Sequence, residues 1–150
     1  MQQINDAGNI TIATETSRDF PARPDILSDA RRMVEGCASQ THLSKEQTED
    51  LLTAVDEAAA NAIRHGSPKE GPNARLRIIC QHTENWLEVR VRDFGTGFAV
   101  PEVPTMPAPD AMGGRGLPLM VALADSVAIA SSPEGTTVTL IKRANGNVHD

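Results

Sequence analysis

The stretch ARLRIICQHTENWLEVRVRDFGTGF, residues 74–98, decides the fold. Apolar and polar residues alternate over residues 74–82 and again over residues 85–93, and a short polar turn around Glu84 joins the two runs. Alternation with a period of two is typical of strands that bury one face, so this stretch predicts a β-hairpin. The second strand ends in an acid, Asp93, and two glycines follow it at a spacing of two.

The sequence before this hairpin predicts one strand and two helices. Residues 9–17 alternate weakly, as in a first strand. Apolar residues then recur at steps of three and four over residues 26–38, which predicts one face of a helix. Ser44 and Gln47 form a capping box, which predicts the start of a second helix. We expect this helix to run to residue 65 and to end in a left-handed Gly66.

The sequence after the hairpin predicts a short helix over residues 117–123 and a final pair of strands over residues 126–132 and 136–143. Residues 100–109 contain four prolines, which exclude a regular helix or a central strand and favour a surface flap. Helices early in the chain and strands late predict the α+β class. We expect a two-layer sandwich in which helices cover one face of a mixed or antiparallel sheet.

Length and composition bound the class of protein. The chain of 150 residues is 39% hydrophobic and 23% charged, as in a soluble globular domain. We expect a single domain over residues 1–150 with its core at about residues 9–143, because domains of roughly 100–150 residues are the commonest. The net charge of -6 would repel a phosphate backbone on average, so nucleic acid is not an expected partner. Proteins and a metal-bound nucleotide are better candidates.

The cysteines and the apolar runs indicate the compartment. Cys37 and Cys80 lie far apart in the sequence and lack the spacing of a metal site, so we expect two reduced core thiols. The N-terminus lacks the basic and apolar regions of a signal peptide, and no apolar run approaches the roughly 20 residues that cross a bilayer. We therefore expect a cytoplasmic protein with no membrane partner. His82, in the hairpin, is expected at the solvated surface.

The segment DEAAANAIRHG, residues 56–66, carries the first candidate site residues. Glu57 and Asn61 are four residues apart on the predicted helix, hence on one face, and His65 continues the line. An acid and an amide among alanines need a polar partner. The amide oxygen of Asn61 suits Mg²⁺, and Glu57 suits a general base that takes a proton from a hydroxyl. The same spacing also fits two side chains that face solvent.

The strand end at Asp93 carries the second set of candidate residues. A carboxylate in this position can accept a hydrogen bond from an exocyclic amino group such as that of adenine. Gly95 and Gly97 lack side chains, so the backbone can approach a ligand closely. A tight turn with a solubilising acid is the other interpretation.

The third segment, GGRGL at residues 113–117, precedes the short predicted helix. The first N–H groups of a helix attract anions, and Arg115 can add charge-assisted hydrogen bonds to a phosphate. The segment is not a Walker loop, because no Gly-Lys-Ser/Thr follows the glycines. A flexible loop before a core helix is the other interpretation.

Taken in order, these segments resemble the Bergerat-type ATP-binding domain of histidine kinases, gyrase, heat-shock chaperone ATPases and mismatch-repair ATPases. Within that superfamily the chain is most similar to the anti-sigma factor serine kinases of bacterial partner switching, through about Lys142. The resemblance implies ATP and Mg²⁺ as cofactors, Glu57 as the general base, Asn61 as the metal ligand and Asp93 as the adenine contact. It implies that the remaining nucleotide-site residues are His65, Gly95, Gly97, Gly114, Arg115, Gly116, Leu117 and Thr136.

The resemblance also implies a function. Members of the family phosphorylate a serine on an anti-anti-sigma protein of the STAS type, sequester a sigma factor in the ground state, and are commonly homodimers. The proline-rich flap departs from the family pattern. A second hypothesis is a nucleotide-gated binding module that sequesters a non-sigma regulator with little or no kinase activity. A third is an α+β domain without a nucleotide.

Overall fold

The computed structural model describes residues 2–4, 10–97 and 116–145. Its strands are β1 (Gln2–Ile4), β2 (Ile10–Ile12), β3 (Thr14–Pro21), β4 (Arg75–Thr83), β5 (Trp86–Asp93), β6 (Ser126–Ser132) and β7 (Gly135–Arg143). Its helices are α1 (Leu27–Ala38), α2 (Lys45–Asn61) and α3 (Gly116–Leu123), with a 3-10 turn η1 (Pro24–Ile26) before α1 and a π-helical turn η2 (Ala62–Gly66) after α2. The predicted helices and hairpins are therefore present, with small differences at their ends.

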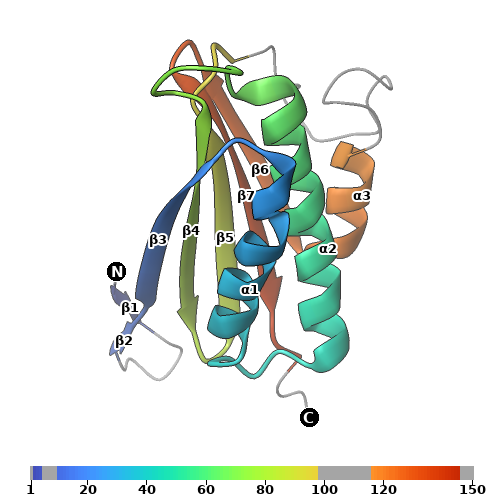
Figure 1. Cartoon of the computed structure of the whole chain (residues 1–150). Helices are drawn as coiled ribbons and strands as arrows, with labels where there is room; N and C mark the ends of the chain where they lie inside the picture. The colour runs from blue at the N-terminus through green and yellow to red at the C-terminus, as the bar shows by residue number, and fades with distance from the viewer. Residues whose placement is uncertain (1, 5–9, 98–115, 146–150) are drawn as a thin grey trace.

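Five of the strands form one antiparallel sheet in the order β3-β4-β5-β7-β6. Each strand runs against its neighbour, with Cys80 opposite Val89 between β4 and β5 and Val89 opposite Leu140 between β5 and β7. The three α-helices lie together on one face of this sheet (Figure 1). The α+β two-layer prediction is confirmed, and the sheet is antiparallel rather than mixed.

The first strand is divided. The sequence predicts one strand over residues 9–17, but β2 ends at Ile12 and pairs with β1 in a separate two-stranded ribbon. The chain then continues as β3, which pairs with β4 at the edge of the main sheet. A change of partner between β2 and β3 therefore separates two strands that the alternation alone runs together.

The core lies between the helices and the inner face of the sheet. The alternating residues of β4, β5 and β7 meet the apolar stripes of α1 and α2 there, and burying each large aliphatic side chain contributes about 1.5–3 kcal/mol. The largest fully buried side chains are Val34, Leu51, Leu52, Val55, Leu76, Ile78, Leu87, Val89, Val91, Leu117, Met120 and Leu140. Cys37 and Cys80 are buried and free, as expected of reduced core thiols.

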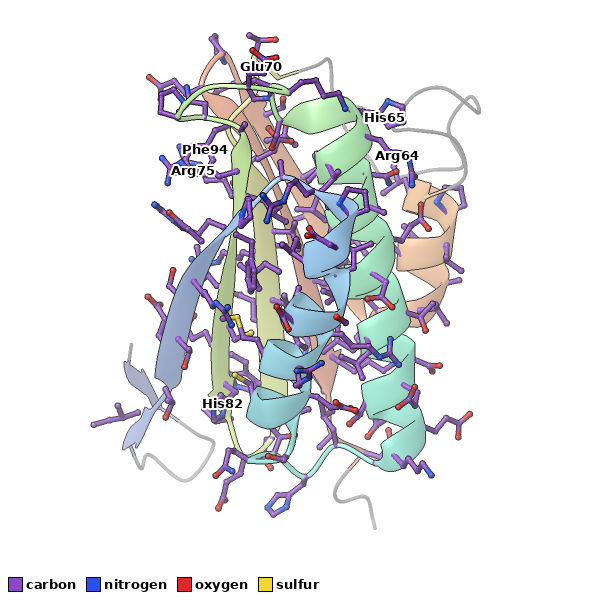
Figure 2. All side chains as sticks on the ribbon, in the orientation of Figure 1. Arg64, His65, Glu70, Arg75, His82 and Phe94 are labelled. Carbon is purple, nitrogen blue, oxygen red and sulfur yellow. The ribbon has the colours of Figure 1, made fainter. Side chains whose placement is uncertain are left out.

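The prediction for His82 is wrong. This side chain is 8% exposed, and it lies near the end of β4 that is opposite to Phe94 (Figure 2). In the alternation of β4, His82 falls on the same face as Leu76, Ile78 and Cys80, which is the face that the helices cover. Gln81 and Thr83 on the other face are buried as well, so both faces of β4 are covered at this end and a polar side chain there is buried.

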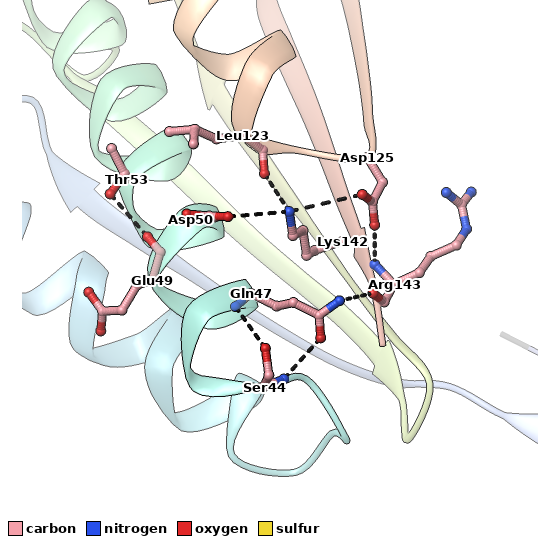
Figure 3. Close-up of polar contacts among 9 residues, drawn as sticks. All are labelled: Ser44, Gln47, Glu49, Asp50, Thr53, Leu123, Asp125, Lys142 and Arg143. Atoms are coloured by element: carbon pink, nitrogen blue, oxygen red, sulfur yellow. Dashed lines mark hydrogen bonds and ion pairs between the residues drawn. The ribbon is translucent and has the colours of Figure 1, made fainter. Parts of the chain in front are cut away.

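A buried lysine fastens the C-terminal end of α3. The side chain of Lys142 on β7 is 11% exposed, and its Nζ donates to the Leu123 carbonyl at 2.7 Å (Figure 3). The same nitrogen lies 3.8 Å from Asp50 Oδ2 on α2 and 3.9 Å from Asp125 Oδ1. One ammonium group thus satisfies the end of a helix and joins α2, α3 and β7.

Candidate functional site

The site begins where α2 changes its winding. We expected an α-helix to residue 65, but α2 ends at Asn61. The π-helical turn η2 follows, in which an N–H donates to the carbonyl five residues earlier. The Ser67 N–H donates to the Ala62 carbonyl at 2.8 Å, which closes this turn. The expectation of a left-handed Gly66 is wrong, since the described glycines with positive φ are at other positions. Single π-helical turns inside helices occur frequently at functional sites.

Gly66 is required for a different reason, which is close approach. A Cβ at Gly66 would overlap the carboxylate of Asp93, because Oδ2 of that group lies directly against the Gly66 backbone. The carbonyl oxygen of Gly66 in turn occupies the place that a Cβ on Gly95 would need. The end of α2 and the turn after β5 are therefore packed backbone against backbone.

Asp93 is the centre of this contact. Its side chain is 6% exposed, and its Oδ1 accepts from the Gly95 N–H at 3.0 Å and from the Thr136 N–H at 3.1 Å. The hydroxyls of Thr136 and Ser131 lie 2.8 Å apart beside it. Two backbone donors hold one carboxylate oxygen, so the group has a fixed direction and its Oδ2 lies at the α2 end.

The turn that follows Asp93 owes its shape to a second glycine. Gly97 has a φ of 83°, a conformation that glycine adopts without strain. A Cβ there would also meet the carbonyl oxygen of Ser132 and would lie 2.7 Å from Ser131 Oγ. The DFGTG turn therefore packs directly on the strand end of β6.

The end of α2 and the turn η2 supply three polar side chains, from Glu57, Asn61 and Arg64. Asn61 is 5% exposed, and its Oδ1 accepts from an Arg64 guanidinium nitrogen at 2.9 Å. The same nitrogen lies 3.7 Å from Glu57 Oε2. Asn61 Nδ2 is buried and has no hydrogen-bond partner among the described residues. An unpaired buried donor costs about 1–3 kcal/mol, which makes this nitrogen a candidate contact for a ligand.

The structure brings together some of the predicted site residues and not others. Asp93, Gly95 and Thr136 are in direct contact, and Arg64 joins Asn61 to Glu57 in the neighbouring helix. His65 is exposed at the end of η2 instead of continuing the buried line of Asn61. Leu117 is 1% exposed and belongs to the hydrophobic core. Gly116 begins α3, and Gly114, Arg115 and the flap at residues 100–109 lie outside the described residues.

Two site residues were missed by the sequence analysis. Arg64 stands three residues after Asn61, a spacing at which helical side chains meet. This spacing alone predicts a contact between the two side chains. The role of Gly66 depends on Asp93, which is 27 positions further along the chain, so no local pattern reveals it.

A groove adjoins the site. It has a volume of about 370 Å³. Its lining residues are Leu27, Ser28, Arg31, Thr53, Asp56, Glu57, Ala60 and Leu119. Arg31 donates to Asp56 at 2.7 Å and to Glu49 at 2.9 Å, which fixes α1 to α2 beneath the groove. Burial raises the pKa of Asp56, against the opposing effect of Arg31. Because Glu57 lies in the wall, a segment seated in the groove would reach the candidate base.

Comparison with known proteins identifies the class. The sequence matches the histidine kinase-like ATPase domain over residues 20–142, and the chain belongs to this family. Within it, the chain belongs with the serine-protein kinases RsbW. It is 33% identical to RsbW of Listeria innocua over 144 residues, 90% of each chain. It is 34% identical to RsbW of Bacillus subtilis over 135 residues, 84% of this chain and 83% of the relative. The resemblance drawn from the sequence is confirmed.

A solved structure shares the fold. The RsbU and RsbW domains of Rv1364c from Mycobacterium tuberculosis match with a TM-score of 0.64 and 17% identity, over 87% of this chain and 32% of that chain. Among the residues that the structure describes, the helices are too short or too polar to span a bilayer.

Proposed function

We propose that this chain is an ATP-dependent serine kinase and anti-sigma factor. In this proposal it phosphorylates a serine of a STAS-type anti-anti-sigma protein and sequesters a sigma factor or an equivalent regulator, acting as a homodimer. Membership of the family and the names of its relatives support the kinase class. The observation that carries the proposal is the buried Nδ2 of Asn61, which has no partner among the described residues and lies one turn from Glu57 on the helix whose end, at Gly66, packs on Asp93.

Adenine recognition is assigned to Asp93. Its Oδ1 is occupied by two backbone N–H groups, while Oδ2 retains the capacity to accept from an exocyclic amino group. Gly95 and Gly97 support this role indirectly, because their lack of a Cβ lets the turn pack closely on Gly66 and Ser132 and so places Asp93. We assign the phosphates to the segment before α3, where Gly114, Arg115 and Gly116 stand in the sequence.

Asn61 and Glu57 are assigned to the reacting end. The carbonyl oxygen of Asn61 has a second lone pair besides the one that Arg64 uses, and its Nδ2 is available to a phosphate oxygen. These groups fit a hydrated Mg²⁺ that is shared with phosphates, which would neutralise charge as the phosphoryl group transfers. Glu57, 27% exposed in its side chain, then accepts the proton of a serine hydroxyl that is presented from the groove.

The test combines binding with phosphoryl transfer. Wild-type chain, Glu57→Gln and Asn61→Ala are titrated with Mg·ATP by calorimetry and incubated with labelled ATP and STAS-type proteins of the same organism. Loss of a general base typically costs about 10²–10⁴-fold in rate, so Glu57→Gln should lose transfer while its Kd for ATP changes by less than about threefold. Asn61→Ala should weaken Mg-dependent ATP binding by about tenfold or more.

Glu46→Gln is the matched control, because Glu46 is an exposed acid in the first turn of the same helix. It should leave binding and transfer unchanged. Equal turnover in wild-type and Glu57→Gln protein would remove the base assignment. If the wild-type chain binds ATP and a regulator stoichiometrically but labels no serine, the chain is a nucleotide-gated binding module instead of a kinase.

A further inference from the structure

Phe94 lies on the opposite side of the backbone from Asp93, the residue before it. Asp93 is directed toward the helix layer and buried, whereas Phe94 lies beside Arg75 on the side of the sheet away from α2 (Figure 2). Consecutive residues of an extended chain project to opposite faces, so the two side chains share one short piece of backbone. A displacement of this backbone therefore moves both side chains.

Three guanidinium groups hold the Phe94 ring. The guanidinium carbon lies 3.8 Å from the ring centroid for Arg75, 4.5 Å for Arg92 and 5.3 Å for Arg77. Each distance is within the range of a cation–π interaction. A single ring thus collects cations from β4 and β5, at the point where β5 ends in the glycine turn.

The arginines are themselves held in place. Asp19 on β3 accepts from Arg77 Nε at 2.6 Å and Nη2 at 3.1 Å, and from Arg75 Nη1 at 2.6 Å. The hydrogen bond from Arg77 lowers the pKa of Asp19, with a smaller contribution from Arg75 and against the effect of burial. Two of the three arginines that contact the ring, Arg75 and Arg77, are therefore fixed by ion pairs to the neighbouring strand β3.

The turn after Asp93 is otherwise held by backbone contacts, with Gly95 against Gly66 and Gly97 against Ser132. Residues 95–97 are Gly, Thr and Gly, and Thr96 is exposed. On the inner side, two backbone N–H groups hold one oxygen of Asp93. On the outer side, Phe94 is the large side chain that ties the same backbone to the sheet.

We infer that Phe94, clamped by Arg75, Arg77 and Arg92, is a positioning residue that sets the direction of the Asp93 carboxylate and thereby the preference for adenine. The inference rests on the proposed function, because it needs a nucleotide base at Asp93. A fixed carboxylate accepts from the amino group of adenine and faces the carbonyl oxygen of guanine, so it favours ATP and disfavours GTP. A carboxylate with a less fixed direction should favour ATP less strongly and disfavour GTP less strongly.

The test is the ratio of affinities for ATP and GTP. In Phe94→Ala, the Kd for ATP should rise about tenfold, as expected when a charged hydrogen bond weakens, while the Kd for GTP changes by less than about twofold. The kcat at saturating ATP should stay within about twofold, since the reacting end is untouched. Phe94→Trp should restore the wild-type ratio, because an indole is the best cation–π partner.

Arg18→Ala is the matched control. Arg18 lies 4.5 Å from the centroid of Phe20 on β3, a cation–π contact of the same kind away from the turn. It should leave the ratio unchanged. If Phe94→Ala is unstable, the double variant Arg75→Gln/Arg92→Gln removes the two guanidinium groups nearest the ring. It should reduce the ratio of ATP affinity to GTP affinity about threefold, because the ring is then held less firmly.

Two results would overturn the inference while leaving the proposed function in place. One is an unchanged ATP/GTP ratio in folded Phe94→Ala, and the other is equal weakening of both nucleotides without rescue by Phe94→Trp, which marks a general packing role. A wild-type chain that binds neither nucleotide removes the proposed function, and the inference with it.

Discussion

The two ends of α2 are held by different kinds of contact. At the N-terminal end, Ser44 Oγ accepts from the Gln47 N–H and Gln47 Oε1 accepts from the Ser44 N–H, both at 3.0 Å. Gln47 Nε2 also donates to the Arg143 carbonyl at 2.8 Å, which joins the helix to β7 (Figure 3). At the C-terminal end a π-helical turn brings Gly66 against Asp93, and Lys69 Nζ donates to the Ile63 carbonyl at 3.3 Å.

This difference separates stability from binding. Side chains satisfy the free N–H groups of the first turn, so that end is complete in itself. The last turn instead depends on the close backbone contact at Gly66 together with Lys69, and it leaves Asn61 Nδ2 without a partner among the described residues. We therefore expect substitutions at the first end to lower the free energy of unfolding and substitutions at the second end to lower nucleotide affinity.

The largest effect is expected for Gly66→Ala. The backbone of Gly66 does not have a positive φ, so alanine is not excluded by conformation, but its Cβ would displace the Asp93 carboxylate. We expect the Kd for ATP to rise about 100-fold or more, and stability to fall by about 1–3 kcal/mol from overpacking. Calorimetric titration and urea unfolding measure the two quantities.

Gly36→Ala is the control for this change. Gly36 lies inside α1, and a Cβ there would meet nothing within 4 Å. The substitution should leave ATP affinity unchanged and stabilise the protein by about 0.5–1 kcal/mol, because alanine is the better helix former. Wild-type ATP affinity in Gly66→Ala would show that the contact with Asp93 does not matter for binding.

The second effect concerns Lys142→Met, at the end of the molecule where α2 is capped. The change keeps the length of the side chain but leaves the Leu123 carbonyl and two carboxylates without their cation. We expect a loss of about 2 kcal/mol in the free energy of unfolding, as for a buried acceptor left unpaired. The Kd for ATP should change by less than about threefold.

Lys45→Met tests whether loss of any lysine has this effect. Lys45 is exposed in the first turn of α2, so its replacement should change stability by less than about 0.5 kcal/mol. If Lys142→Met instead weakened ATP binding as much as stability, the polar network would belong to the nucleotide site, and the two ends would not be independent.

The sequence predicted what local spacing controls. The capping box at Ser44, the hairpin of β4 and β5, and the apolar stripe of α1 depend on neighbours within about four residues, and the structure has all three. His82 was within reach of the same reasoning, because the period of β4 already assigns it to the buried face. His82 was expected at the surface because its side chain is polar.

The site itself is mostly non-local. The Thr136 N–H meets Asp93 across 43 positions, and this contact requires β7 to lie between β5 and β6, an order that the chain sequence does not reveal. The π-helical turn depends on Gly66 meeting that same acid. The sequence correctly predicted that Gly66 ends the helix, but its close contact with Asp93 could be seen only in the packing.

The smallest effect is expected for Ser44→Ala, and it is the sharpest test of separation. The substitution leaves the Gln47 N–H without its acceptor, but Ser44 is exposed and water can replace part of the bond, so a loss of about 1 kcal/mol is expected. Ser44→Asp keeps an acceptor at the cap and should retain most of that stability. Both variants should bind ATP like the wild type, because about 25 Å of intact helix separates residue 44 from the last turn of α2 at 1.5 Å per residue. A parallel loss of ATP affinity in Ser44→Ala alone would mean that the first turn of α2 transmits its strain to Asn61, and the division between a stabilising end and a binding end would no longer hold.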